Sequence, residues 1–261
     1  MASTKHVLLF GDSLTQGYTK SGRQFHPYGK KLQTLFDAAN LDVQVTIEGL
    51  SGDRVKNPRW QQRLKNQLEK MQKNEIAYRA VVILGGINDV FQTSATSQNI
   101  FDALCATYRL CEEFGVGHVI GCSLMEVDLG RAGDEELKRV MVNELLRSSP
   151  SSPFAGTKAP TTATRFTFFE LSDQFPLHRL SPEDKKLYWD DRAHCTTAGY
   201  DRMGELVFEA LRPLLSEMYL AQLRHNRHAN DNNSNTSLVV LRDLSENVTE
   251  LIITLMMYTD G

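Results

Sequence analysis

The sequence lacks the features that mark several large classes of protein. Its four cysteines are scattered and form no C-x-x-C pair, which disfavours a disulfide framework and favours free thiols in a reducing compartment. No apolar run reaches the length of a membrane span. The first run, residues 6–10, is too short for the apolar core of a secretory signal. A cytoplasmic location without a membrane span is therefore expected.

An excess of charge of either sign is also missing. Lys and Arg number 29 against 32 Asp and Glu, a net charge of −3, whereas nucleic-acid-binding domains usually carry clustered basic residues. No nucleic-acid partner is expected. The chain contains neither G-x-G-x-x-G nor a P-loop motif, which counts against a flavodoxin-like nucleotide binder. With 261 residues, 41% of them hydrophobic, the composition is that of one globular domain with a tail.

Five short apolar runs are rich in β-branched and aromatic residues and do not alternate strictly with polar ones. They are residues 6–10, 43–47, 80–86, 118–124 and 165–171. Strands that are covered on both faces have this pattern. The stretches between them repeat Leu, Phe and Met at helical spacing. Strands that alternate with helices predict an α/β fold of βαβ units around a mostly parallel, doubly wound sheet.

Two segments interrupt this alternation. Residues 148–164 are rich in Ser, Pro and Thr and predict a loop. A last helix is expected from about Thr197 to Leu223, followed by a polar, Asn-rich linker and then an apolar segment. We therefore expect a domain over 1–223. Over 224–261 we expect a linker and an apolar tail that packs on the domain or on a second subunit as a homo-oligomer.

The first predicted strand runs directly into Gly11, Asp12 and Ser13. Ligands of open α/β sheets lie beyond the carboxyl ends of the strands. A serine in that position is a candidate nucleophile if a base lies within hydrogen-bond reach. Asp12 or Ser13 could equally serve only as a helix N-cap, where both residue types are favoured. The tripeptide by itself leaves both interpretations open.

Two further strand ends combine glycine with hydrogen-bond donors. The segment EGLSGDRV contains Gly49 and Gly52, and glycine lets a backbone N–H approach a ligand closely. The segment LGGINDVF contains Asn88, whose amide is of the kind that stabilises an oxyanion. Taken alone, the first segment could be a plain turn, and the second could be an Asx turn or a helix cap. Their equivalent places at strand ends favour one shared site.

The segment YWDDRAHCTTAGY places Asp191 three residues before His194. A histidine can remove the proton of a serine while an aspartate on its other ring nitrogen fixes the tautomer. Asp190 competes for the carboxylate role. A metal site would need more ligands than the adjacent Cys195 supplies. The order Ser, Asp, His is that of the α/β-hydrolases, but the G-x-S-x-G elbow is absent around Ser13, so that fold is disfavoured.

Four motifs thus follow one another in order. They are G-D-S-L-T at 11–15, G-L-S-G at 49–52, G-I-N-D at 86–89 and D-R-A-H at 191–194. The set resembles the SGNH hydrolase superfamily, also called GDSL esterases and lipases, over residues 6 to about 212. The resemblance implies a three-layer α/β/α, flavodoxin-like sandwich with a five-stranded parallel sheet. Cys195, the 148–164 loop and the tail depart from the commonest pattern.

The resemblance also implies the roles of site residues. Ser13 would be the nucleophile, His194 the base and Asp191 its orienting partner. The backbone N–H groups of Ser13 and Gly52, with the side chain of Asn88, would form the oxyanion hole. The implied reaction is hydrolysis of a small-molecule carboxylic ester through an acyl-serine, without metal or cofactor. The absence of an evident long apolar lid favours small acyl esters.

Several alternatives remain open on the same residues. A thioesterase, a lysophospholipase or a carbohydrate O-acetylesterase would use the same acyl-enzyme. An acyltransferase would pass the acyl group to an alcohol instead of water. A non-catalytic scaffold is a different class; the loss of the serine, the histidine or an oxyanion donor would mark it, and all are present.

Overall fold

The computed structural model describes residues 4–128, 133–148 and 164–230. Five strands form one sheet in the order β4-β1-β5-β6-β7, and every neighbouring pair is parallel. Their bounds are β1 Lys5–Gly11, β4 Val43–Gly49, β5 Tyr78–Leu84, β6 His118–Cys122 and β7 Arg165–Phe169. Each overlaps one of the predicted apolar runs. The predicted α/β fold with a five-stranded parallel sheet is confirmed.

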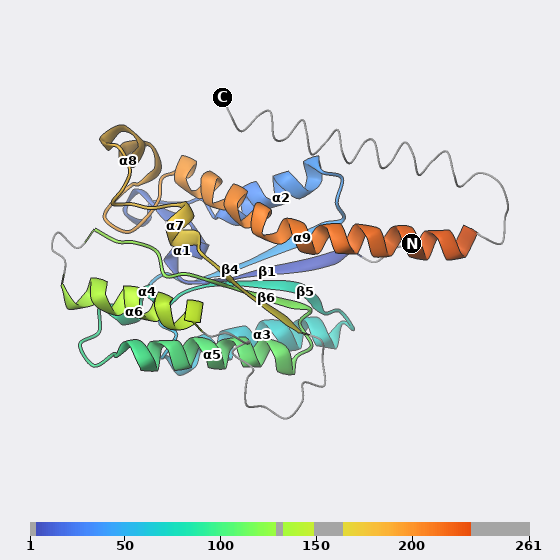
Figure 1. The fold of residues 1–261 in the computed structure, drawn as a ribbon, viewed down its shortest axis with the longest axis horizontal. Coiled ribbons are helices and arrows are strands. Elements are labelled where there is room, and N and C mark those ends of the chain that lie inside the picture. The colour runs from blue at the N-terminus through green and yellow to red at the C-terminus, as the bar shows by residue number, and fades with distance from the viewer. Residues whose placement is uncertain (1–3, 129–132, 149–163, 231–261) are drawn as a thin grey trace. The chain divides into compact units, whose positions relative to one another are not determined.

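The strands are apolar because helices cover both faces of the sheet, as Figure 1 shows. On one face lie α3 (Pro58–Lys73), α5 (Ser97–Glu113) and α6 (Asp134–Ser148). Phe10 of β1 and Ile83 of β5 are fully buried in one cluster with Trp60 of α3. Burial of one such side chain stabilises the fold by about 1.5–3 kcal/mol. These contacts fix the strands whose carboxyl ends carry the motifs.

The opposite face is covered by α2 (Tyr28–Ala38) and by the first part of α9 (Thr197–Asn230). The rings of Phe36 in α2 and Phe208 in α9 lie 5.5 Å apart, centre to centre. Both helices were predicted from apolar spacing. The layers are thus helix, sheet, helix, as the resemblance implied.

Helix α9 is longer than predicted. Residues 224–230, expected to open the linker, are helical; RHNRHAN contains no Gly or Pro that would end a helix. The chain divides into two compact units, one reaching Ala210 and one beginning at Leu211. The apolar tail and most of the 148–164 loop lie outside the described residues, so the tail's packing and the boundary at residue 223 stay predictions.

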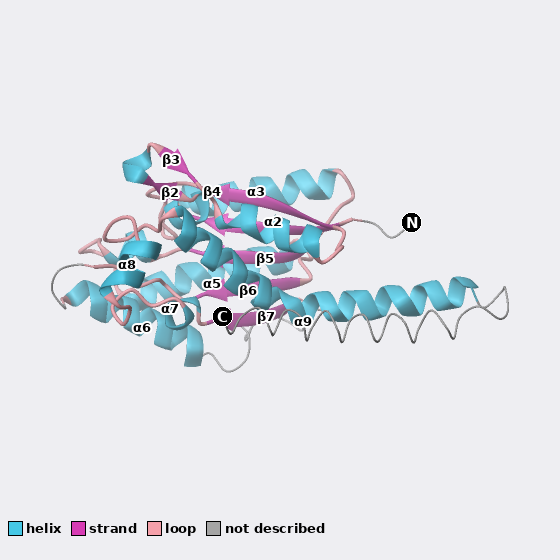
Figure 2. Ribbon diagram, turned by 90° about the horizontal axis from the view of Figure 1, so that it is seen from above, coloured by secondary structure: helices cyan, strands magenta, loops and turns pink. Residues whose placement is uncertain are grey.

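Short elements that the sequence did not predict gather beyond the carboxyl ends of the strands. They are α1 (Ser13–Gln16), β2 (Tyr18–Thr19), η1 (Lys20–Gly22), β3 (Gln24–Phe25), α4 (Ile87–Val90), α7 (Leu171–Gln174) and α8 (Pro182–Tyr188). β2 and β3 pair antiparallel into a small hairpin, seen at this end in Figure 2. In the described parts of the chain no helix combines the length and apolarity needed to cross a membrane.

Candidate active site

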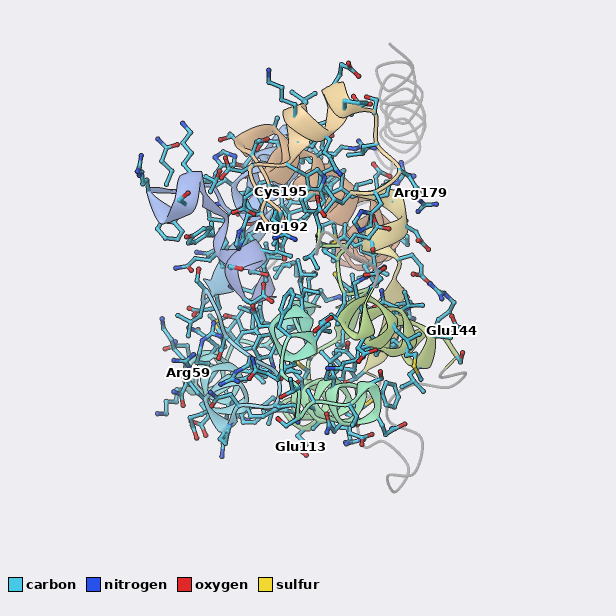
Figure 3. The ribbon with its side chains drawn as sticks, turned by 90° about the vertical axis from the view of Figure 1, so that its left-hand side faces the viewer. Arg59, Glu113, Glu144, Arg179, Arg192 and Cys195 are labelled. Atoms are coloured by element: carbon cyan, nitrogen blue, oxygen red, sulfur yellow. The ribbon has the colours of Figure 1, made fainter. Side chains whose placement is uncertain are left out.

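All four motifs meet at one edge of the sheet. β4, β1 and β5 are parallel neighbours, so the segments with Gly52, Ser13 and Asn88 leave the sheet at the same edge. The fourth motif lies on a loop that an antiparallel bridge between Trp189 and Cys195 closes. Figure 3 looks onto this edge, with Cys195 labelled in its upper middle. The topology brings together residues from both ends of the domain.

A line of hydrogen bonds joins Ser13, His194 and Asp191. Ser13 Oγ lies 3.0 Å from His194 Nε2, and His194 Nδ1 lies 2.9 Å from Asp191 Oδ2. When the imidazole is neutral and Nδ1–H donates to the carboxylate, Nε2 has a free lone pair that can accept the serine proton. Ser13 is 7% exposed and the His194 side chain 22%, so the hydroxyl is sheltered but reachable.

Asp191 is held as a carboxylate. Partial burial alone would raise its pKa, but hydrogen bonds from the His194 ring and from the backbone N–H groups of Ala193 and His194 outweigh that effect and lower the pKa below its ordinary value. The competing Asp190 points elsewhere: its Oδ2 accepts the backbone N–H of Lys20 at 2.5 Å. Asp190 therefore ties the hairpin to the histidine loop, and Asp191 faces the imidazole.

The local backbone explains why Ser13 is presented to His194. Asp12 is the N-cap of α1, and its Oδ1 accepts the N–H of Leu14 at 3.0 Å. Ser13 is the first helical residue. The N-cap interpretation is thus confirmed for Asp12, while Ser13 as the nucleophile stays a prediction. Gly11 is required just before them, because a Cβ there would overlap the side chain of Thr15 and the carbonyl of Leu84.

The three predicted oxyanion donors lie on the segments that follow β1, β4 and β5. Gly52 has a φ of +74°, a conformation that favours glycine. In the described part of the chain, the N–H groups of Ser13 and Gly52 have no hydrogen-bond partner. Asn88 Nδ2 donates to the carbonyl of Asp53 at 3.0 Å and lies 3.4 Å from Asp12 Oδ2. The short bond orients the Asn88 amide, and its role as an oxyanion donor stays a prediction.

An ion-pair network that the sequence analysis did not identify supports the Gly52 turn. Asp53 is fully buried, and its carboxylate contacts Arg63 Nη1 at 2.5 Å and Arg59 Nη2 at 3.0 Å. Arg63 also donates to the carbonyl of Glu48 at 2.9 Å. The available signal was Asp53 directly after Gly52, followed by two arginines four residues apart on a predicted helix. The network fixes the turn that contains Gly52.

Tyr18 is a second residue that the sequence analysis missed. Its ring centre lies 4.5 Å from that of His194, with 39° between the ring planes. The hydroxyl of Tyr200 donates to the Tyr18 carbonyl at 2.7 Å and holds the start of the hairpin. Tyr18 thus packs against the imidazole of His194 from the hairpin.

The site also carries a buried acid whose charge is costly. Burial, together with the nearby carboxylates of Asp89 and Asp53, raises the pKa of Asp12 to about 7 against 3.8 in its ordinary state, although the Leu14 N–H opposes the shift. When the pKa of a carboxyl is higher in the folded than in the unfolded chain, the folded state loses stability as pH rises between those two pKa values. The folded protein should therefore weaken between about pH 4 and pH 7.

Asp12→Asn tests this effect, because asparagine also caps helices but carries no charge. Between pH 5 and pH 8 the free energy of unfolding of the wild type should fall by roughly 2–3 kcal/mol relative to the variant. Urea denaturation at both pH values measures the difference. Burial also raises the pKa of Asp89, but Asp89 is present in both proteins. Parallel pH dependence of the two proteins would contradict a charged, buried Asp12.

Two further features of the site concern metal ligands and a thiol. Among the residues that the structure describes, no three or more His, Cys, Asp or Glu side chains are grouped so that they could hold a metal ion. Cys195, next to His194, is fully buried. Burial raises the pKa of its thiol far above the ordinary value, so it stays protonated and is a poor nucleophile. The hydroxyl of Ser13 remains the candidate nucleophile.

Solved structures share this fold at low sequence identity. A lipase/acylhydrolase from Enterococcus faecalis is 18% identical, with a TM-score of 0.57 over 80% of this chain and 96% of its own. A family 3 carbohydrate esterase from Clostridium thermocellum is 15% identical, with a TM-score of 0.59 over 83% and 99%. The psychrotrophic esterase EstA from Pseudoalteromonas sp., also solved inhibited by monoethylphosphonate, is 14% identical, with a TM-score of 0.57 over 81% and 99%.

The sequence comparison is more specific. No curated protein sequence matches this chain significantly. The model of the GDSL-like Lipase/Acylhydrolase family matches residues 9–202, which include all four motifs and most of the chain. The resemblance inferred from the motifs is confirmed. The chain belongs to the GDSL-like lipase/acylhydrolase family and is a hydrolase that acts on ester bonds.

Proposed function

We propose that this protein is a serine esterase that hydrolyses small carboxylic esters through an acyl-serine intermediate on Ser13. The observation that carries the proposal is the continuous line of hydrogen bonds from Ser13 through His194 to Asp191, with distances of 3.0 Å and 2.9 Å. A serine hydroxyl is a weak nucleophile unless a base takes its proton. The line provides that base and the carboxylate that orients it.

In the proposed reaction Ser13 Oγ attacks the ester carbonyl carbon while His194 Nε2 takes the hydroxyl proton. The carbonyl oxygen becomes an oxyanion and accepts hydrogen bonds from the N–H groups of Ser13 and Gly52 and from Asn88. His194 then returns the proton to the leaving alcohol, and the acyl group stays on Ser13. A water molecule attacks the acyl-serine with the same base, which releases the carboxylic acid and restores the hydroxyl.

Asn88→Ala should lower kcat for a short ester by about 10²–10³, since one oxyanion donor is typically worth that much. KM should change far less, because the donor acts chiefly on charge that develops in the transition state. Steady-state kinetics with p-nitrophenyl acetate measure both constants. Asn66→Ala, at an exposed position of α3, is the matched control and should keep full activity. Full activity of Asn88→Ala would remove Asn88 from the proposed oxyanion hole.

The substrate range is tested by a chain-length series of acyl p-nitrophenyl esters and acyl thioesters, run beside Ser13→Ala. We expect kcat/KM to be highest for acetyl to butyryl esters and to fall for long chains. A preference for thioesters would indicate a thioesterase, and one for long acyl chains a lysophospholipase. The partition of products with an added alcohol separates hydrolysis from acyl transfer. No turnover of any member would support a non-catalytic scaffold.

A further inference from the structure

A pocket of about 320 Å³ lies beside the loops that carry the proposed oxyanion donors. It opens between the start of α3 and the segment after α4. The polar and charged residues of its lining are Arg54, Lys56, Asn57, Asp89, Gln92 and Ser94. Two cations and several uncharged donors thus face one hollow of a size suited to a small molecule.

Neither cation of the pocket is paired directly within the described residues. The backbone N–H groups of Arg54 and Lys56 make hydrogen bonds, but the Arg54 guanidinium and the Lys56 ammonium make no hydrogen bond and no ion pair there. The nearby Arg59 and Arg63, by contrast, are both paired with Asp53. Arg54 is half-buried, and a partly desolvated cation gains more from an anion than a fully hydrated one does.

The acidic member of the lining does not neutralise these cations through direct contact. Asp89 is almost fully buried, and its two carboxylate oxygens accept the backbone N–H groups of Val55 and Lys56 at 2.8 Å and 3.1 Å. Asp89 therefore fastens the segment that carries the cations to α4. Its carboxylate attracts both cations at longer range, but their hydrogen-bond donors stay available to a ligand.

The pocket is built on the same two loops as the proposed oxyanion hole. Arg54 follows Gly52 by two residues, so their Cα atoms lie within about 7 Å of each other. Asp89 directly follows Asn88, about 3.8 Å away by the same measure. Asn88 also donates to the carbonyl of the residue before Arg54. None of Ser13, Asp191 and His194 lines the pocket, so it lies next to the reacting groups without including them.

We propose that this pocket binds an anionic group, a carboxylate or a phosphate, of the ester substrate, with Arg54 and Lys56 as its charged ligands. The inference rests on the proposed esterase function. Because Arg54 and Asp89 lie one or two residues from the proposed oxyanion donors, we infer that a second group of a bound ester can reach the pocket. Hydrogen bonds between ionised partners are the strong ones, so the anion would select and orient the ester.

Two matched pairs of esters test the proposal. In the first, the mono-p-nitrophenyl ester of glutaric acid carries a carboxylate on its acyl chain, and its methyl ester is the neutral partner. In the second, acetylglycerol 3-phosphate carries a phosphate on its alcohol, and acetylglycerol is neutral. We expect wild type to prefer the charged member of at least one pair by about tenfold in kcat/KM. The preferred pair identifies the anion and the side of the ester that bears it.

The double variant Arg54→Gln/Lys56→Gln should lose this preference, so that the ratio of kcat/KM between charged and neutral esters falls to near one. The ratio is taken within each protein, so a general loss of activity does not imitate the effect. Lys70→Gln/Lys73→Gln removes the same charge at the other end of α3 and should keep the ratio. In wild type, inorganic phosphate should raise KM for the preferred charged ester more than for its neutral partner.

The possible failures are distinct. If wild type hydrolyses the neutral esters through Ser13 but prefers neither charged ester, the proposal that the pocket binds an anion is wrong, and the proposed esterase function is unaffected. The same holds if the preference survives in Arg54→Gln/Lys56→Gln, or if phosphate acts equally on both members of a pair. If wild type and Ser13→Ala hydrolyse every ester at the same background rate, the proposed function itself is wrong.

Discussion

Ser13→Ala is expected to reduce kcat for p-nitrophenyl acetate by a factor of about 10⁶, leaving only what the oxyanion donors and binding contribute. His194→Ala should lose roughly as much, because without the base at 3.0 Å the hydroxyl keeps its proton. The double variant should be no worse than either single variant, since the two groups act as one unit. Steady-state kinetics of the three proteins, with thermal unfolding as a check on folding, measure this.

The control variants lie outside the site. Ser148 on α6 and His178 are both exposed, and Ser148→Ala and His178→Ala should each keep wild-type activity. Additive losses, with the double variant falling far below both singles, would show that Ser13 and His194 act separately. Near-full activity of Ser13→Ala would show that another group is the nucleophile.

Asp191→Asn is expected to lower kcat by about 10⁴. Asparagine fills the same space but carries no charge, so it cannot stabilise the imidazolium that forms as Ser13 attacks. If its amide donates to Nδ1, the histidine is also held in the tautomer that cannot take the serine proton. Kinetics at several pH values from 6 to 9 check that the loss persists wherever the wild type is active.

Asp190→Asn is the matched control, because it makes the same change one residue away. Its carboxylate bonds to the backbone of Lys20 rather than to the imidazole. Its loss should loosen the hairpin that carries Tyr18 and lower kcat less than tenfold. If Asp190→Asn were the more damaging change, Asp190 would be the partner of the histidine.

Much of the architecture was predictable, because each strand is covered on both faces and its sequence is therefore a separate apolar run. The positions of the motifs were predictable because the carboxyl ends of neighbouring parallel strands lie at one edge of the sheet. Asp191 and His194 were predictable as a pair because they lie on one loop. Their proximity to Ser13 depends on the fold of the whole domain. It could be predicted only because the four motifs occur in the order found in a known family.

The parts that were not predicted depend on contacts between distant segments. Tyr18 lies in a hairpin whose strands are two residues long, too short to show any periodicity, and its contact with His194 has no local signature. The pocket lined by Arg54 and Lys56 combines residues from the segments after β4 and β5. Helix α9 extends beyond the predicted end at Leu223, because a polar composition alone does not end a helix that contains no Gly or Pro there.

The central claim is that Ser13 is the nucleophile, and labelling with a fluorophosphonate tests it most directly. The probe phosphonylates a serine only where a base activates it and oxyanion donors receive the charge. Mass spectrometry of the digested protein should find the label on Ser13 in the wild type, none in Ser13→Ala, and greatly slowed labelling in His194→Ala. A folded, ester-hydrolysing wild type that carries the label on another residue, or carries none, would contradict the account.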